Sequence, residues 1–254
     1  MKLIKKNKDV KSILTNYWKS WDTMESKFAK KFNKELKKLI IIELSENFKS
    51  KLGDTFTVSF RIDAILKGLE RLNNGYLDSV TKKAFRDAGI DYNRIIANRA
   101  ESEAIKELKK HLDKLLSNLR NKLESENIYG TEEENFRFLA NSLIVQYENE
   151  IKQRDIARTM IKAETEITKK YVWSADDDLK RIWLSQRDGA VRLSHQLADG
   201  QGEDELGFFY LGVIKTPYPA GSGHIEEDAN CRCVTLPLHQ KNYTAFKKLV
   251  KRMQ

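Results

Sequence analysis

Long apolar runs, prolines and cysteines are all scarce in this chain of 254 residues. Uninterrupted apolar runs such as residues 39–42 reach only four residues, whereas a membrane-spanning helix requires about 18. The basic amino-terminal segment is not followed by an apolar stretch with a small-residue cleavage site. We therefore expect no membrane span and no secretory signal. The protein should act in the cytoplasm where it is made, or in an assembly built there.

Helix-breaking residues are missing from most of the chain. All three prolines lie after residue 216, and seven of the twelve glycines lie from Gly189 onward. Before that point apolar residues recur every three or four positions, which is typical of amphipathic helices. We expect the second of these helices to end at Asn73-Asn74-Gly75, because glycine favours a helix stop. The pattern predicts helices over residues 11–47, 63–73, 105–123 and 136–151.

Three local patterns add detail to this helical region. Thr131 followed by Glu134 is typical of a capping box that opens a helix. Residues 55–60 alternate polar and apolar side chains, which predicts an isolated strand. The apolar stripe over 105–123 is shorter than three heptads, so it favours packing within one chain over a dimeric coiled coil.

The character of the sequence changes from about Trp183 onward. Residues 208–211 and 231–236 have the composition of strands, and a loop rich in Pro, Gly and Ser lies between them. The fold class that we predict is mainly α, with a long helical N-terminal region followed by a small α+β C-terminal module. The predicted divisions are a helical body over 1–150, the module over 151–240 and a basic tail over 241–254.

The formal charge of +9 is concentrated at the two ends of the chain. Residues 1–51 contain fourteen lysines and six acids, and residues 241–254 contain five basic residues and no acid. Such ends can bind the phosphates of DNA. The acids Asp22, Glu25 and Glu35 alternate with the lysines, however, which favours an ordinary solvated helix face. The candidate DNA-binding residues are Lys5, Lys6, Lys8, Lys247, Lys248, Lys251 and Arg252.

Aromatic residues among the N-terminal lysines allow a second interpretation. Trp18, Trp21 and Phe28 could stack on bases in a plain nucleic-acid-binding module. Their spacing of three and seven residues also forms an apolar stripe on a helix. Helical periodicity favours the apolar stripe.

Cys231 and Cys233 are the only cysteines. On an extended strand their thiols would share one face, and this spacing is poor for a disulfide between them. They are then either buried apolar thiols or two ligands of a soft metal such as zinc, which needs further ligands. His195 and His224 are the candidates for these, with Asp188 or Asp199 as substitutes.

The residues around His195 are compatible with either a catalytic or a structural role. In a helix starting near Asp188, that carboxylate could cap the helix or pair with Arg192. An Asp–His pair can act as a general base, or it can be a buried network that fixes a turn. The sequence has no nucleophile elbow, no His-Asn-His arrangement and no Gly-rich phosphate loop. Asp176-Asp177-Asp178 is expected to begin a helix. We therefore favour the structural role.

The order of these motifs resembles a known family. It is similar to the C-terminal domain of phage Mu F-like minor head proteins, also called head morphogenesis proteins. The resemblance covers about residues 155–238, with Glu164 in a matching upstream segment. Ala190 stands where the family commonly has Arg. The residues that carry the resemblance are Trp183, Ser185, Asp188, Val191, Arg192, His195, Asp199, Gly200, Phe208, Tyr218-Pro219 and Asn230-Cys231-Arg232-Cys233.

The resemblance implies a minor capsid protein of the virion and not an enzyme. Such proteins lie in the capsid interior near the portal and associate with the portal, the major capsid protein or the scaffolding protein. They support procapsid assembly and DNA packaging or delivery after assembling in the host cytoplasm. The resemblance also makes a grouping of His195 with Cys231 and Cys233 more probable, with zinc or a hydrogen-bonded cluster as the result. The alternatives are a metal-dependent nuclease or toxin-like enzyme on a phage-derived module, and a non-specific DNA-binding protein.

Overall fold

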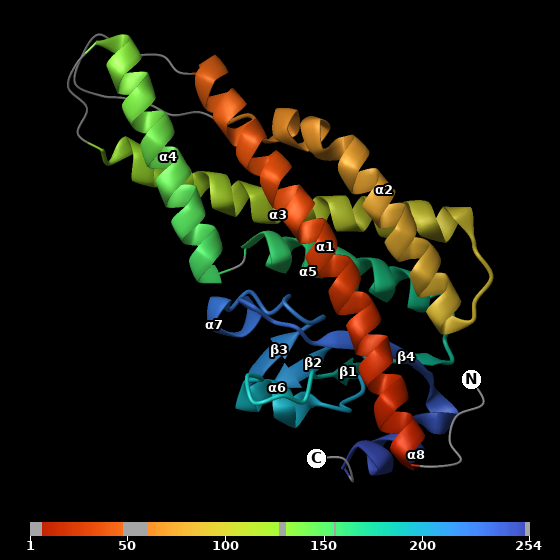
Figure 1. Cartoon of the computed structure of the whole chain (residues 1–254). Helices are drawn as coiled ribbons and strands as arrows, with labels where there is room; N and C mark the ends of the chain where they lie inside the picture. Colours follow the sequence, from red (N-terminus) through yellow and green to blue (C-terminus); the bar gives the residue numbers. More distant parts are fainter. Residues whose placement is uncertain (1–6, 48–59, 127–130, 155, 252–254) are drawn as a thin grey trace.

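The computed structural model describes residues 7–47, 60–126, 131–154 and 156–251. Five long helices form a body that comes first in the chain, and a small module of strands and short helices follows (Figure 1). This is the mainly α fold with a C-terminal α+β module that the sequence predicts. No helix among the described residues combines the length and the apolar character that a membrane crossing needs. The helices of the body are α1 (Asn7–Asn47), α2 (Ile62–Ala88), α3 (Arg94–Glu124), α4 (Glu132–Arg154) and α5 (Ile156–Trp173).

An apolar stripe along α1 forms part of the main core. Trp21 is fully buried, and Trp18 and Phe28 are each 8% exposed, which confirms the stripe and places these rings against the protein interior. The stripe of α3 is buried in the same core, where α3 packs beside α5. The 105–123 pattern therefore reflects packing within the chain, as expected.

The second helix is longer than the sequence suggests. The prediction that it stops at Asn73-Asn74-Gly75 is wrong, because α2 continues to Ala88 and ends at Gly89, whose φ is 72°. The Asn73 side chain is buried and donates to Glu164 Oε1 at 2.9 Å, so it is engaged by tertiary structure. Buried apolar residues continue beyond Gly75. Their packing outweighs the helix-breaking tendency of glycine, which amounts to about 1 kcal/mol.

The capping box is confirmed at the start of α4. The backbone N–H of Thr131 donates to Glu134 Oε2 at 3.0 Å, and the backbone N–H of Glu134 donates to Thr131 Oγ1 at 3.3 Å. The predicted strand at 55–60 lies almost wholly outside the described residues.

Two antiparallel strand pairs form the core of the C-terminal module. The strand β1 (Leu179–Leu184) pairs with β4 (Val234–His239), with Trp183 opposite Thr235, and β2 (Phe209–Leu211) pairs with β3 (Ile214–Thr216). Its helices are α6 (Leu193–Ala198), α7 (Ile225–Asp228) and α8 (Gln240–Lys251).

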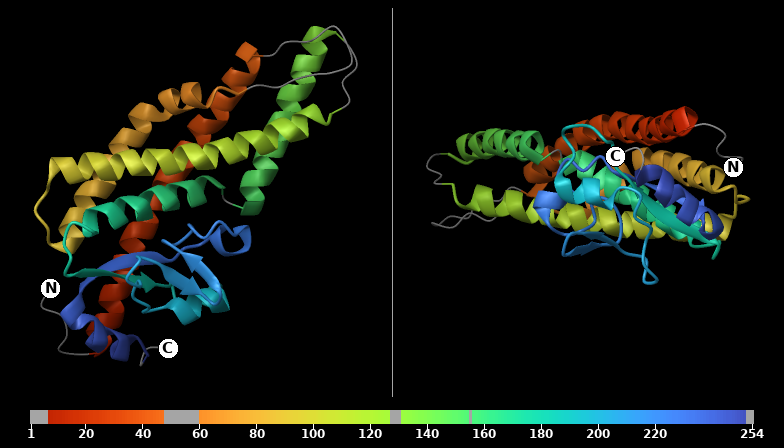
Figure 2. Two further views of the ribbon diagram at one scale, coloured as in Figure 1. Left: turned by 180° about the vertical axis from the view of Figure 1, so that it is seen from behind. Right: turned by 90° about the horizontal axis from the view of Figure 1, so that it is seen from below.

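The boundary predicted at residue 150 does not separate two units. Helix α5 lies beyond it but packs against α1, α2 and α3 of the body (Figure 2). Hydrogen bonds also join α1 to the module: the Tyr17 hydroxyl donates to the Thr235 carbonyl at 2.9 Å, and Trp18 Nε1 donates to the Arg232 carbonyl at 2.7 Å. The module is thus built onto the helical body.

Three other predictions for the module need correction. Residues 231–233 precede β4, so the cysteines are not in a strand. Residues 176–178 form a turn between α5 and β1 instead of a helix start, because β1 begins at Leu179. The expected basic tail is helical as far as Lys251, and its residues Phe246, Leu249 and Val250 are buried.

Candidate metal centre

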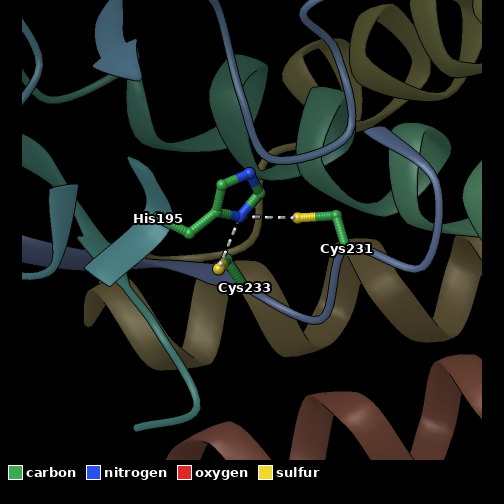
Figure 3. Close-up of side chains that lie close together, drawn as sticks. All are labelled: His195, Cys231 and Cys233. Carbon is green, nitrogen blue, oxygen red and sulfur yellow. Dashed lines mark hydrogen bonds between the residues drawn. The ribbon is translucent and has the colours of Figure 1, made fainter. Parts of the chain in front are cut away.

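A histidine and two cysteines from separate segments meet inside the module. His195 lies on α6, while Cys231 and Cys233 lie on the segment that leads from α7 into β4. All three side chains are buried, being 2%, 4% and 2% exposed, respectively. Figure 3 shows both sulfurs directed toward the same nitrogen of the imidazole ring.

The three side chains present one nitrogen and two sulfurs to a common point. His195 Nδ1 lies 3.3 Å from Cys233 Sγ and 3.7 Å from Cys231 Sγ. All three atoms lie within 4.8 Å of one another, so the cluster can hold a metal ion. Imidazole nitrogen and thiolate sulfur are donors that zinc prefers. The two cysteines were expected on a strand, but they lie in the segment just before β4, where both thiols reach the histidine.

A carboxylate orients the imidazole from its other side. His195 Nε2 lies 2.9 Å from Glu227 Oε2, which also accepts a hydrogen bond from the Ser194 hydroxyl at 2.9 Å. When Nε2 carries the proton and donates it to Glu227, Nδ1 is free to bind a metal. Histidine ligands of metals are commonly fixed in this way by a second hydrogen bond.

The electrostatics of the cluster favour a thiolate at one sulfur. A hydrogen bond from Cys233, together with the neighbouring His195, holds the pKa of Cys231 well below its ordinary value despite burial. Burial and the charge of Cys231 raise the pKa of Cys233 well above its own. Burial works against the charged form of His195, but the hydrogen bond and charge of Cys231 outweigh it and raise the pKa of the imidazole. The shifts favour a charged form at Cys231 and at His195, and the neutral thiol at Cys233.

Space for a single small ligand lies next to the cluster. A cavity of about 20 Å³ is bounded by His195, both cysteines and residues including Arg192 and Asn230. A cavity needs roughly 10–15 Å³ to hold one water molecule. A water or a small ion therefore fits beside the three donor atoms.

A larger cavity of about 270 Å³ lies between α3, α5 and residues 220–229. It is lined by residues of α3 and α5 and by the segment 220–229, which includes α7. Lys114, Met160 and Asp228 are among the lining residues. None of the three cluster residues borders it.

The other predicted ligands lie elsewhere. His224 is on the surface, with its side chain 53% exposed and its Nδ1 3.4 Å from Glu226. Asp199 is buried, but its carboxylate accepts hydrogen bonds from the Ser185 backbone at 2.9 Å and from Arg187 at 2.6 Å. Neither belongs to the metal-competent group, which among the described residues contains only His195, Cys231 and Cys233.

The predicted Asp188–Arg192 interaction does not form. Helix α6 begins at Leu193, so Asp188 precedes it and pairs with Arg232 at 3.1 Å. Arg192 instead donates to the Ala229 carbonyl at 2.6 Å. The two residues therefore hold the 229–232 segment against the turn before α6, which positions the cysteines.

Of two further residues expected in the structural cluster, Trp183 contacts His195 and Glu164 lies in the body. Trp183 is fully buried and meets His195 edge-on, with 5.4 Å between ring centroids. Glu164 lies on α5 and bonds Asn73 of α2, as part of the body. Burial raises the pKa of Glu164 to about 8, so this carboxyl is neutral at pH 7.

A second buried polar group, missed by the sequence reasoning, joins α1 to α5. Lys162 Nζ lies 2.7 Å from Glu25 and 4.0 Å from Glu166, and Lys169 Nζ lies 2.7 Å from Glu166. Each of these side chains is at most 1% exposed. Glu166 also accepts a hydrogen bond from the backbone of Thr235 at 3.2 Å. Two lysines and two glutamates thus neutralise one another where the body meets β4.

Sequence alone gave few signals for these additional partners. Glu227 stands in an acidic stretch, and nothing in its local pattern marks it as the partner of His195. Lys162, Glu166 and Lys169 have helical spacing on α5, which is equally common on exposed faces. Only the fold shows that this face is enclosed.

The candidate DNA-binding residues are distributed as follows. Lys247, Lys248 and Lys251 are exposed on α8. Lys8 belongs to the first turn of α1. Lys5, Lys6 and Arg252 lie outside the described residues.

Comparisons of the chain with protein-family models, curated proteins and solved structures gave no match. The chemistry of the site therefore has to be argued from its geometry. A buried N–S–S donor set with an orienting carboxylate can bind one soft metal ion. It can also persist as a hydrogen-bonded thiolate–imidazolium pair.

Proposed function

We propose that the protein is a minor head protein of a tailed bacteriophage, of the head morphogenesis type, which docks on the portal or inner capsid. In this role it supports procapsid assembly and the packaging or delivery of DNA. The observation that carries the proposal is that His195 lies against Cys231 and Cys233 in the fold. His195 and Cys233 are 38 residues apart in the sequence. These three are among the residues that carry the resemblance to minor head proteins.

Zinc is the ion that we assign to the cluster. Its preferred donors match one imidazole and two sulfurs, and the low pKa of Cys231 favours the thiolate that zinc requires. Zinc bound there would lock α6 to the 231–233 segment. The small cavity beside the cluster has room for a water as the remaining ligand.

A structural role suits this environment better than catalysis. The three side chains are at most 4% exposed, and the adjoining cavity holds only about 20 Å³. Burial of all three donor side chains disfavours the approach of a phosphodiester to a metal in this position. We therefore assign the cluster to folding and docking of the module, and not to a nuclease.

The test is a pull-down from cells in which phage heads are assembling. We expect the tagged protein to recover the portal protein or the major capsid protein. The variant C231S/C233S should lose this association, because the docking module would no longer be fixed by the metal. The matched variant H224A changes an exposed histidine outside the cluster and should keep it. Recovery of neither head protein with the wild-type chain would contradict the proposal.

A further inference from the structure

The outward side of α1 carries a row of lysines. At about 100° per residue, six of them fall within a sector of about 120° on the helix surface. From first to last they extend over about 28 Å along the axis. All six side chains are exposed, on a helix that crosses the front of the body in Figure 1. This row, which we call the α1 lysine stripe, consists of Lys19, Lys27, Lys30, Lys31, Lys34 and Lys38.

The acids that alternate with these lysines in sequence do not share their face. Asp22 turns to an ion pair with Arg158 of α5. Glu25 is buried, and its carboxylate lies 2.7 Å from Lys162. Glu35 lies at the edge of the stripe and reaches only Lys38, at 3.4 Å. In the sequence, lysines and acids alternate, which favoured an ordinary solvated face. In the folded helix the acids lie off this face, so the stripe has an excess of positive charge.

Most ammonium groups of the stripe lack an opposing charge. Among the residues that the structure describes, no carboxylate lies within 4.0 Å of five of the six, which are Lys19, Lys27, Lys30, Lys31 and Lys34. The neighbouring Lys37 differs, because it pairs with Glu148 at 2.5 Å. The uncompensated charges follow one another along the helix, which suits a linear polyanion.

From this arrangement we infer that the α1 lysine stripe binds the phosphate backbone of duplex DNA without reading its bases. Duplex DNA presents one charge per about 1.7 Å of axis, so a row about 28 Å long faces many phosphates. Lysine serves phosphate as a point charge, and α1 contains no arginine for bidentate contacts to guanine.

The composition of α1 argues against two other polyanionic partners of the stripe, single-stranded nucleic acid and an anionic membrane. Single-stranded nucleic acid is usually held by stacking on exposed aromatic rings. The tryptophans of α1, Trp18 and Trp21, and Phe28 are instead buried in the core. A membrane-surface helix needs an apolar face toward the lipid, and that face of α1 is covered by the rest of the body.

The inference goes beyond the proposed function and does not depend on it. The sequence predicts candidate DNA contacts only at the chain ends, around Lys8 and Lys247. The stripe occupies the middle of α1 and would bind duplex DNA whether or not the protein associates with a phage head.

The experiment measures binding of a short fluorescent duplex to the full chain by anisotropy, over a series of salt concentrations. The test variant is K27Q/K30Q/K34Q, since glutamine keeps the helix propensity of lysine. The control K82Q/K106Q/K109Q removes the same charge from exposed lysines on α2 and α3 that are paired with acids. Circular dichroism checks that both variants fold.

We expect the test variant to bind at least tenfold more weakly than wild type at low salt. The slope of log K against log salt should become shallower by about 2.7, which corresponds to three lost phosphate contacts. The control should change neither quantity appreciably, and duplexes of different sequence should bind alike. Equal losses in both variants, no wild-type binding at low salt, or equally tight binding to vesicles of anionic lipid would each overturn the inference. Portal recovery by the test variant reports separately on the proposed function.

Discussion

The helical body and the C-terminal module each bury a cluster of polar side chains, and the two clusters differ in how their charges and donor atoms are matched. In the body, Lys162 and Lys169 are matched by Glu25 and Glu166, so the charges balance within the chain. In the module, His195 and the two cysteines direct three donor atoms to one point beside a small cavity. The charges of the first group balance without any ligand, although Glu25 Oε1 is buried without a hydrogen-bond partner. The second can hold an ion, which is why we propose a structural role for the first group and metal binding for the second.

The largest effect should come from unbalancing the first group. K162M leaves Glu25 and Glu166 buried with only Lys169 between them. Removing one partner of a buried ion pair typically costs about 3–5 kcal/mol. We expect a loss of this size in the free energy of unfolding, measured with urea.

The matched control is K82M, whose partner Asp78 is half exposed, and it should lose at most about 1 kcal/mol. If K162M were no less stable than K82M, the idea of a mutually dependent charge network would be wrong.

Glu164 offers a test of burial without a charge partner. Its pKa is about 8 in the folded protein, against an ordinary value of 4.5. The Glu164 carboxyl thus loses its proton at a lower pH in the unfolded chain than in the folded protein. The free energy of unfolding therefore falls as pH rises from about 4.5 to 8. At pH 7 this linkage costs on the order of 3 kcal/mol. E164Q keeps a neutral side chain and should show a flatter stability curve.

Urea unfolding at pH 5 and pH 8 measures the difference. E133Q, at a side chain that is 74% exposed, is the control and should follow the wild-type pH dependence. An E164Q curve parallel to wild type would show that Glu164 is ionised in the folded protein.

A smaller effect is expected from the carboxylate behind the histidine. E227Q weakens the hydrogen bond that directs His195 Nδ1 toward the sulfurs. Loss of such a partner typically lowers metal affinity by about 10- to 100-fold. Competition against a zinc-binding dye measures the affinity. E226Q, on an exposed neighbour, should leave the affinity unchanged. Equal affinities for the two variants would remove Glu227 from the site.

No effect at all is expected in a nuclease assay. With Mg²⁺ or Mn²⁺, the purified protein should leave plasmid DNA intact, because His195 is only 2% exposed. Cleavage that disappears in H195A would reverse the assignment and favour the metal-dependent enzyme.

Patterns with a regular period predicted the fold well. The apolar periodicity located α1 and α3, and the Thr131–Glu134 capping box located the start of α4. The stop at Gly75 failed, because tertiary packing of Asn73 against Glu164 overrides a local signal. The length of a helix thus depends on contacts that the sequence does not display.

The candidate site was only partly predictable. The grouping of His195 with Cys231 and Cys233 was expected from the resemblance, because spacing alone left the cysteines as either buried thiols or metal ligands. His224 and Asp199 are also residue types that bind metals. The path of the loop 216–224 places His224 on the surface, and Asp199 is held by a hydrogen bond from the Ser185 backbone. Glu227 and Lys162 resemble ordinary surface charges until the fold encloses them.

Metal content tests the central claim most directly. We predict that the purified full-length protein, supplied with Zn²⁺ and then freed of unbound ions, retains one zinc per chain. C231S/C233S should retain none, and H224A should retain as much as wild type. A wild-type zinc content no higher than that of the double variant would contradict the account, and would leave the cluster as a hydrogen-bonded thiolate–imidazolium pair.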